Sequence, residues 1–120
     1  MRFGRLNDEF RERTKQYAAR IIRAYVKLPK KREEVRVLGK QMLRSGTSVA
    51  AHLREASRAR SDAEFISKLG GALQEADETQ LWLELLHEEC GVASDEHTEL
   101  EAESSELIAI MTTMIRRTKS

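Results

Sequence analysis

The chain has 120 residues and a net charge of +1, with 40% hydrophobic, 34% charged and only 5% aromatic residues. This composition fits one helical domain over residues 1–120. An intrachain disulfide is excluded because Cys90 is the only cysteine. The sequence also lacks the run of roughly 20 apolar residues that a membrane-spanning helix needs. Residues 1–6 lack the apolar core of a signal peptide, so we expect a cytoplasmic protein.

The first predicted helix runs from about Asn7 to Leu28. The Asn7 side chain can cap its free N–H groups, and Pro29 ends it because proline disfavours helical geometry at the preceding residue. Apolar residues recur every three or four positions, or at seven, as one face of a helix requires. They are Leu6, Phe10, Tyr17, Ile21, Tyr25 and Leu28.

The second predicted helix runs from about Lys31 to Arg58. Its middle, residues 45–48, reads Ser-Gly-Thr-Ser. Small side chains there predict the close approach of a neighbouring helix, and the alternative is a local kink or break. The apolar face consists of Val35, Leu38, Met42, Val49, Leu53 and Ala56.

The third predicted helix runs from Asp62 to about Glu89, after a capping box in which Ser61 and Glu64 each satisfy the other's backbone N–H. Gly91 is the expected C-terminal cap. Trp82 lies off the apolar face, which is typical of a second interface. That face consists of Phe65, Leu69, Ala72, Leu73, Ala76, Leu83 and Leu86.

The fourth predicted helix follows a cap at Ser94 and runs from about Asp95 to Arg117. Four helices joined by short turns predict an all-α, antiparallel, up-down-up-down four-helix bundle. The apolar positions of this last helix are Leu100, Leu107, Ile108, Met111, Met114 and Ile115.

Charge divides the chain into two halves. Residues 1–60 carry 17 basic and 6 acidic residues, a net charge of +11, whereas residues 61–120 carry 4 basic and 14 acidic residues, a net charge of −10. The first helical hairpin is therefore basic and the second acidic.

Motifs for catalysis are weak. His87 and Cys90 have the spacing H-x-x-C but no evident further ligands, and Glu84 with His87 gives one Glu-x-x-His motif where di-iron bundles use two. Ser48 and His52 share a helical face, but a helix interior offers no N–H groups for an oxyanion hole. We expect neither an enzyme nor a cofactor.

Basic residues are the stronger functional candidates. Arg54 and Arg58 are four positions apart and share a face, and such clusters can neutralise phosphates. The alternatives are a solvated face or ion pairs with the acidic hairpin. The candidate residues are Arg44, Arg54, Arg58 and Arg60, followed by Lys30, Lys31 and Arg32, with further basic residues Arg11, Arg13, Lys15, Arg20 and Arg23 on the first helix.

Oppositely charged halves could also join identical copies head to tail. Leu81 and Trp82 are the candidate apolar anchors of such an interface. Four acidic residues are expected to pair with basic groups, either within a subunit or between subunits. These are Glu55, Glu75, Asp77 and Glu78.

The residues at 44–56 (RSGTSVAAHLREA), 58–61 (RARS), 64–69 (EFISKL) and 74–86 (QEADETQLWLELL) resemble a family of bacterial four-helix bundle proteins encoded in intervening sequences of 23S ribosomal RNA genes. His52 departs from the family, which commonly has Asn there. The resemblance implies an up-down-up-down bundle, ring-shaped homopentamers and no established enzyme activity. It also implies a looser kinship with the accessory protein of diversity-generating retroelements, a basic pentamer that binds reverse transcriptase and nucleic acid.

These observations favour a homo-oligomeric, non-enzymatic scaffold, of five copies by the resemblance, that binds RNA or a ribonucleoprotein through its basic surface. A protein-interaction module without nucleic-acid binding is the alternative, and a metal-dependent enzyme is the third reading.

Overall fold

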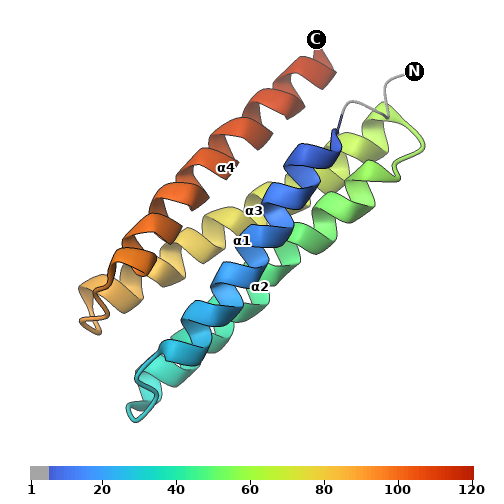
Figure 1. The fold of residues 1–120 in the computed structure, drawn as a ribbon. Coiled ribbons are helices and arrows are strands. Elements are labelled where there is room, and N and C mark those ends of the chain that lie inside the picture. Colours follow the sequence, from blue (N-terminus) through green and yellow to red (C-terminus); the bar gives the residue numbers. More distant parts are fainter. Residues whose placement is uncertain (1–5) are drawn as a thin grey trace.

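The computed structural model describes residues 6–120, which form a bundle measuring 50 × 21 × 20 Å (Figure 1). Successive helices run in opposite directions, and the described residues contain no strand. No helix in this described part of the chain is both long and apolar enough to cross a membrane. Residues 1–5, and with them most of the segment judged to lack a signal peptide, lie outside the described residues. The helices are α1 (Asp8–Lys27), α2 (Glu33–Ser57), α3 (Asp62–Glu88) and α4 (Asp95–Lys119).

The N-terminal caps follow local chemistry. The side chains of Asn7 and Ser94 each accept a hydrogen bond from the backbone N–H three residues later, at 2.8 and 3.1 Å, as predicted. At α3 the capping box is only half formed. Ser61 accepts from the Glu64 N–H at 3.0 Å, but the Glu64 carboxylate accepts from the Arg60 N–H at 2.8 Å instead of from Ser61. That bond lowers the pKa of Glu64.

The C-terminal ends also have identifiable causes. Pro29 holds Leu28 in an extended conformation with ψ of 142°, so α1 stops before it. Gly91 has a positive φ of 73°, which glycine adopts at little cost. This turn lets the Val92 N–H donate to the carbonyl of Leu86 at 3.0 Å and closes the end of α3, as predicted.

The predicted apolar faces point inward and form one core, with the remaining predicted positions partly buried against it. Composition alone did not reveal that five polar side chains between positions 6 and 120 are buried as well. The fully buried predicted residues include Tyr17, Ile21, Val35, Met42, Val49, Leu53, Phe65, Leu69, Leu83, Leu86, Leu100, Leu107 and Met111. The buried polar residues are Thr14, Ser45, Thr79, His97 and Ser104.

Glycines on α2 and α3 allow close helix packing. A Cβ atom added to Gly46 would lie 2.8 Å from both Cγ atoms of Ile21 on α1, and one added to Gly71 would lie 2.5 Å from Cδ2 of His52 on α2. The helix α2 continues unbroken through residues 45–48. The predicted close approach is therefore confirmed, and the alternative of a break in the helix is wrong.

A layer of hydroxyl groups crosses the core, with one residue from each helix. The Tyr17 hydroxyl on α1 lies 2.5 Å from Ser104 Oγ on α4, and Ser45 Oγ on α2 lies 2.7 Å from Thr79 Oγ1 on α3. All four residues are buried. Burial raises the pKa of Tyr17 to about 12, although hydrogen bonds from Ser104 and Thr79 partly oppose the shift.

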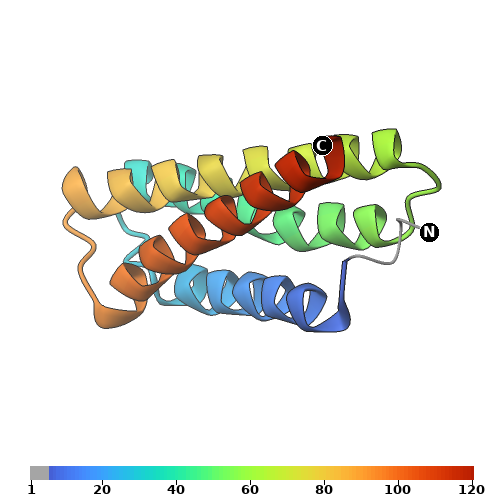
Figure 2. The same cartoon turned by 90° about the horizontal axis from the view of Figure 1, so that it is seen from above.

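The helix α4 crosses the bundle obliquely. In Figure 2 its N-terminal end lies on the α1 side, and its C-terminal end lies over the first turns of α3. It packs mainly against α3, while α1 packs mainly against α2.

Replacing Gly46 by Ala should destabilise the protein by roughly 2 kcal/mol, because the new methyl group meets the β-branched and buried Ile21. Gly70→Ala is the matched control, since a Cβ there meets nothing within 4 Å and removing a helical glycine should stabilise by up to about 1 kcal/mol. Urea unfolding of both variants measures the difference. Equal effects would contradict the packing argument.

Alkaline pH should destabilise the protein through Tyr17. Its pKa is higher in the folded protein than the ordinary value of 10, so its contribution is complete below about pH 10 and is lost as the pH rises through 12. We expect a loss of about 2 kcal/mol that is absent in Tyr17→Phe, measured by urea unfolding at several pH values. Tyr25→Phe, which changes the other tyrosine, should keep the decline; its loss there would contradict the assignment to Tyr17.

Candidate nucleic-acid interface

Basic side chains of α1 that face α4 have carboxylate partners. The Arg13 guanidinium binds Glu103 through two hydrogen bonds of 2.7 Å each and reaches Glu106 at 2.9 Å. These carboxylates raise the pKa of Arg13 above its ordinary value. Arg20 reaches Glu96 at 3.1 Å. The α1–α4 seam therefore joins the basic hairpin to the acidic one.

Ion pairs between α2 and α3 also join the basic hairpin to the acidic one. Arg44 lies 3.4 Å from Glu75 and 3.1 Å from Glu78, and Lys68 lies 3.4 Å from Glu55. Three of the four acidic residues singled out in the sequence thus have partners within the chain. Arg44, a candidate phosphate ligand, already has two carboxylates beside it.

Two candidate phosphate ligands in the turn between α1 and α2 make structural contacts within the chain. Lys30 donates to the carbonyl of Val26 at 3.0 Å, and its ammonium lies 4.8 Å from the centre of the Tyr25 ring. Arg32 donates to the carbonyl of Cys90 and so connects the α1–α2 turn to the α3–α4 turn. These contacts occupy side chains that the sequence assigned to phosphate binding.

The remaining candidates are exposed. Arg60 pairs with Glu64 at 3.5 Å on the surface. Lys31, Arg54 and Arg58 make no ion pair with any residue in the described part of the chain. Lys31 lies at the opposite end of α2 from Arg54 and Arg58, and this helix of 25 residues is about 38 Å long. The predicted residues therefore do not form a single site.

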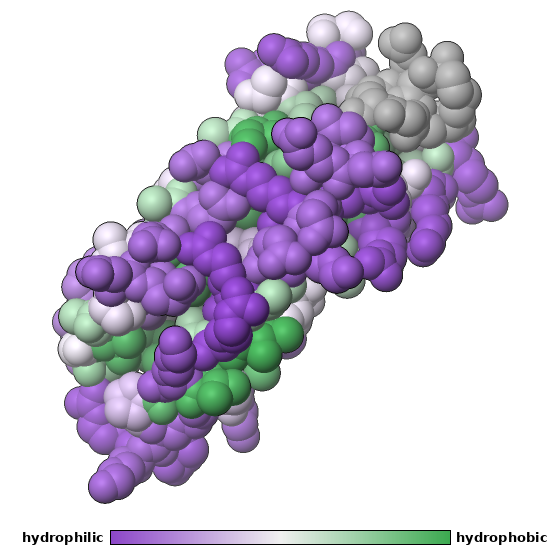
Figure 3. Space-filling view, in the orientation of Figure 1, coloured by the Kyte–Doolittle hydropathy of each residue, from purple (hydrophilic) through white to green (hydrophobic). Residues whose placement is uncertain are grey.

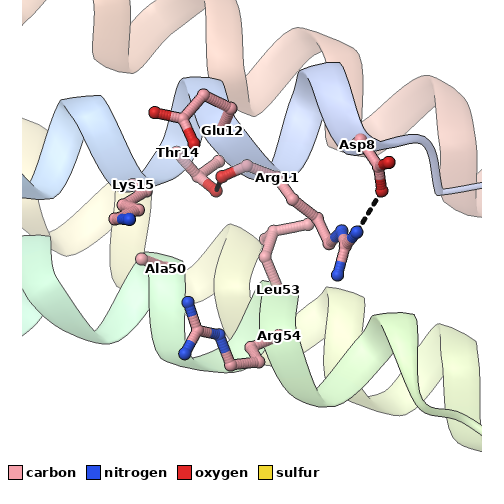
Figure 4. A pocket seen from close by; sticks show the side chains of 8 residues that line it. All are labelled: Asp8, Arg11, Glu12, Thr14, Lys15, Ala50, Leu53 and Arg54. Atoms are coloured by element: carbon pink, nitrogen blue, oxygen red, sulfur yellow. Dashed lines mark hydrogen bonds and ion pairs between the residues drawn. The ribbon is translucent and has the colours of Figure 1, made fainter.

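A cavity of about 240 Å³ opens between α1 and α2 beside Arg54 (Figure 4). Lys15 enters it from α1 and Arg54 from α2, and neither has an ion-pair partner among residues 6–120. The sequence shows that Arg11 and Lys15 are one turn apart, but not that they face Arg54. We call Arg11, Lys15, Arg54 and Arg58 the basic cluster.

Acidic groups near the cavity are already engaged. Asp8 pairs with Arg11, and Glu12 accepts a hydrogen bond from Gln16 at 2.7 Å. The Glu12 carboxylate also points away from α2 (Figure 4). Lys15 therefore has no carboxylate partner across the opening.

Apolar side chains are exposed on both hairpins. On the basic hairpin, Ile22 is 46% exposed and Val26 is 68% exposed, and Figure 3 shows hydrophobic surface beside the lower half of α1 among hydrophilic side chains. On the acidic hairpin, Leu81 is 45% exposed in a hollow that it shares with acidic side chains. Those side chains are Asp77, Glu78 and Glu84.

Trp82, the other predicted anchor, is only partly exposed and packs against the core. Its Nε1 atom is buried and has no hydrogen-bond partner in the part of the chain that the structure describes. Leu81 is thus the more accessible of the two apolar anchors.

The histidines have structural contacts. His52 Nδ1 lies 2.9 Å from the carbonyl of Ser48, and its ring covers Gly71, so it does not approach the Ser48 hydroxyl as a base would. His97 is buried, and its Nε2 lies 2.6 Å from the carbonyl of Leu83, a role that the sequence did not indicate. No three His, Cys, Asp or Glu residues between positions 6 and 120 are arranged to hold a metal ion.

Comparisons with known proteins match this fold. A family model described as the 23S rRNA-intervening sequence protein matches residues 7–113. A crystal structure of a protein of unknown function from the S23 ribosomal protein family of Bacteroides thetaiotaomicron is similar, with a TM-score of 0.79 and 37% sequence identity. The similarity covers 88% of this chain and 96% of that chain. A search of curated proteins gave no match.

Proposed function

The chain belongs to the 23S rRNA-intervening sequence protein family, and from this premise we propose that it is a non-enzymatic cytoplasmic protein that binds RNA phosphates through the basic cluster. One observation carries the proposal. Cations in the α1–α4 and α2–α3 seams have carboxylate partners, whereas Lys15, Arg54 and Arg58 have none within residues 6–120. Neighbouring cations of this kind repel one another, and a polyanion relieves that repulsion.

The form of the surface favours structured RNA over single strands. Aromatic side chains among the described residues are buried or partly buried, so the basic cluster has no ring on which an unpaired base could stack. Contacts to phosphates position a nucleic acid without reading its sequence. We therefore propose binding to folded RNA with little dependence on base sequence.

Salt dependence tests the proposal. The double variant Lys15→Gln with Arg54→Gln should bind a 20-base-pair RNA duplex more weakly than the wild type. Its slope of log K against log salt concentration should be smaller in magnitude by about 1.8, because two phosphate contacts are lost. Fluorescence anisotropy at several salt concentrations measures both quantities.

The matched control is Arg116→Gln with Arg117→Gln, which removes the same charge from exposed positions on α4. It should keep most of the affinity and the slope. Equal weakening of the two double variants would mean that binding follows net charge and not the basic cluster. Wild-type protein that does not bind the duplex at low salt would overturn the proposal.

A second proposal concerns assembly. We propose that copies of the chain associate, five of them as the family resemblance implies, with Leu81 as the apolar anchor. The exposed Leu81 among Asp77, Glu78 and Glu84 complements the exposed Ile22 and Val26 of the basic hairpin in both charge and polarity. Charge complementarity would set the register, while the apolar side chains would supply affinity.

Leu81→Glu should abolish this assembly, because it places a charge at the centre of the interface. Native mass spectrometry and light scattering measure the mass of the particle. Ser67→Glu, at another exposed position of α3, is the control and should keep the wild-type mass. A wild-type mass of one subunit at every concentration tested would contradict assembly and leave RNA binding unaffected.

A further inference from the structure

We propose that the cavity between α1 and α2 binds the 5′-terminal phosphate monoester of an RNA strand, an inference that rests on the RNA binding proposed above. The cavity would then be a specific pocket for one phosphate group within a surface that otherwise holds RNA by its general charge.

The hollow exists because the residues beneath it are short or turned aside. Ala50 contributes only a methyl group at its floor, next to Leu53. Thr14 is buried, and its hydroxyl donates to the carbonyl of Arg11 at 2.9 Å. The space of about 240 Å³ is more than ten times the roughly 10–15 Å³ that one water molecule needs, so it has room for a phosphate group.

Two cations at the rim are open to an anionic ligand. Lys15 and Arg54 line the hollow from opposite helices, and neither has an ion-pair partner among the described residues. The third cation, Arg11, is held by Asp8. Glu12, whose carboxylate points away from α2, is the remaining acid at the rim.

A phosphate monoester carries about −1.5 to −2 charges at pH 7, whereas a phosphodiester within a strand carries one. The Arg54 guanidinium can hold two of its oxygens side by side, and the Lys15 ammonium can reach the third. The monoester can therefore balance the charges of both Lys15 and Arg54, whereas a diester, with one negative charge, can balance only one of them.

The position of the hollow between two helices also favours a terminal phosphate over an internal one. Helix α1 walls the hollow on one side and α2 on the other. A terminal phosphate has one substituent and can enter such a hollow end-on, whereas an internal phosphate would bring a ribose on each side.

Two RNA hairpins of identical sequence test the inference, one with a 5′-monophosphate and one with a 5′-hydroxyl. Wild-type protein should bind the phosphorylated hairpin about tenfold more tightly, the effect of one added charge-assisted contact. Equal affinities would overturn the pocket while leaving the proposed RNA binding intact, so the two failures are distinguishable.

Substitutions separate a pocket from general charge. Ala50→Leu fills the hollow without changing any charge. It should abolish the tenfold preference for the 5′-phosphorylated hairpin, while the 5′-hydroxyl hairpin still binds. Lys15→Gln and Arg54→Gln should reduce the preference as well, and Arg116→Gln should not. A preference that survives in Ala50→Leu, with folding verified by circular dichroism, would place the phosphate elsewhere.

A small ligand provides a readout that does not depend on binding of a whole RNA. Adenosine 5′-monophosphate should shift the NMR signals of the Ala50 and Lys15 amides, and adenosine at the same concentration should not. Identical shifts with the two compounds, or shifts only at distant residues, would refute the pocket even if no RNA hairpin bound.

Discussion

The hydroxyl layer in the core fixes how the four helices align. Tyr17 meets Ser104, and Ser45 meets Thr79, far from solvent. A sliding of one helix by a single turn would separate these pairs. Ser45, Thr79 and Ser104 would keep bonds to carbonyls of their own helices. The buried Tyr17 hydroxyl would lose its partner, at a cost of about 1–3 kcal/mol. Apolar contacts tolerate such slips much better. The close approach of Gly46 to Ile21 adds a steric constraint between α1 and α2, which neither hydroxyl pair joins.

That alignment determines which charges meet. With α1 held in register, Arg13 faces Glu103, and with α2 held in register, Arg44 faces Glu75 and Glu78. In each seam between a basic and an acidic helix, carboxylates of one helix can therefore pair with cations of the other. Helices α1 and α2 are both basic, so the side they share has few carboxylates to offer. The exposed positive charge of Lys15 and Arg54 is thus a consequence of where the chain places its acidic half, rather than of an unusual local concentration of cations.

Much of this fold follows from sequence patterns, and the site follows only in part. The apolar faces, the caps at Asn7 and Ser94 and the turn at Gly91 depend on residues close together in the chain, so spacing reveals them. The family match over residues 7–113 confirms the resemblance that rested on residues 44–86. The partners of Arg44 and the juxtaposition of Lys15 with Arg54 depend on how helices rotate against each other, which periodicity does not specify. The buried His97 was missed because its partner, the carbonyl of Leu83, belongs to the helix before it.

The oblique course of α4 implies that the bundle does not open uniformly. This helix rests mainly on α3, and ion pairs from Arg13 and Arg20 are prominent in its link to α1. Salt and acid weaken such links far more than they weaken apolar packing. Partial unfolding should therefore begin by the separation of α4 from α1, which would expose the apolar side of both helices while α2 and α3 stay together. In a crowded cell, such a state would be the form of the protein most vulnerable to proteases.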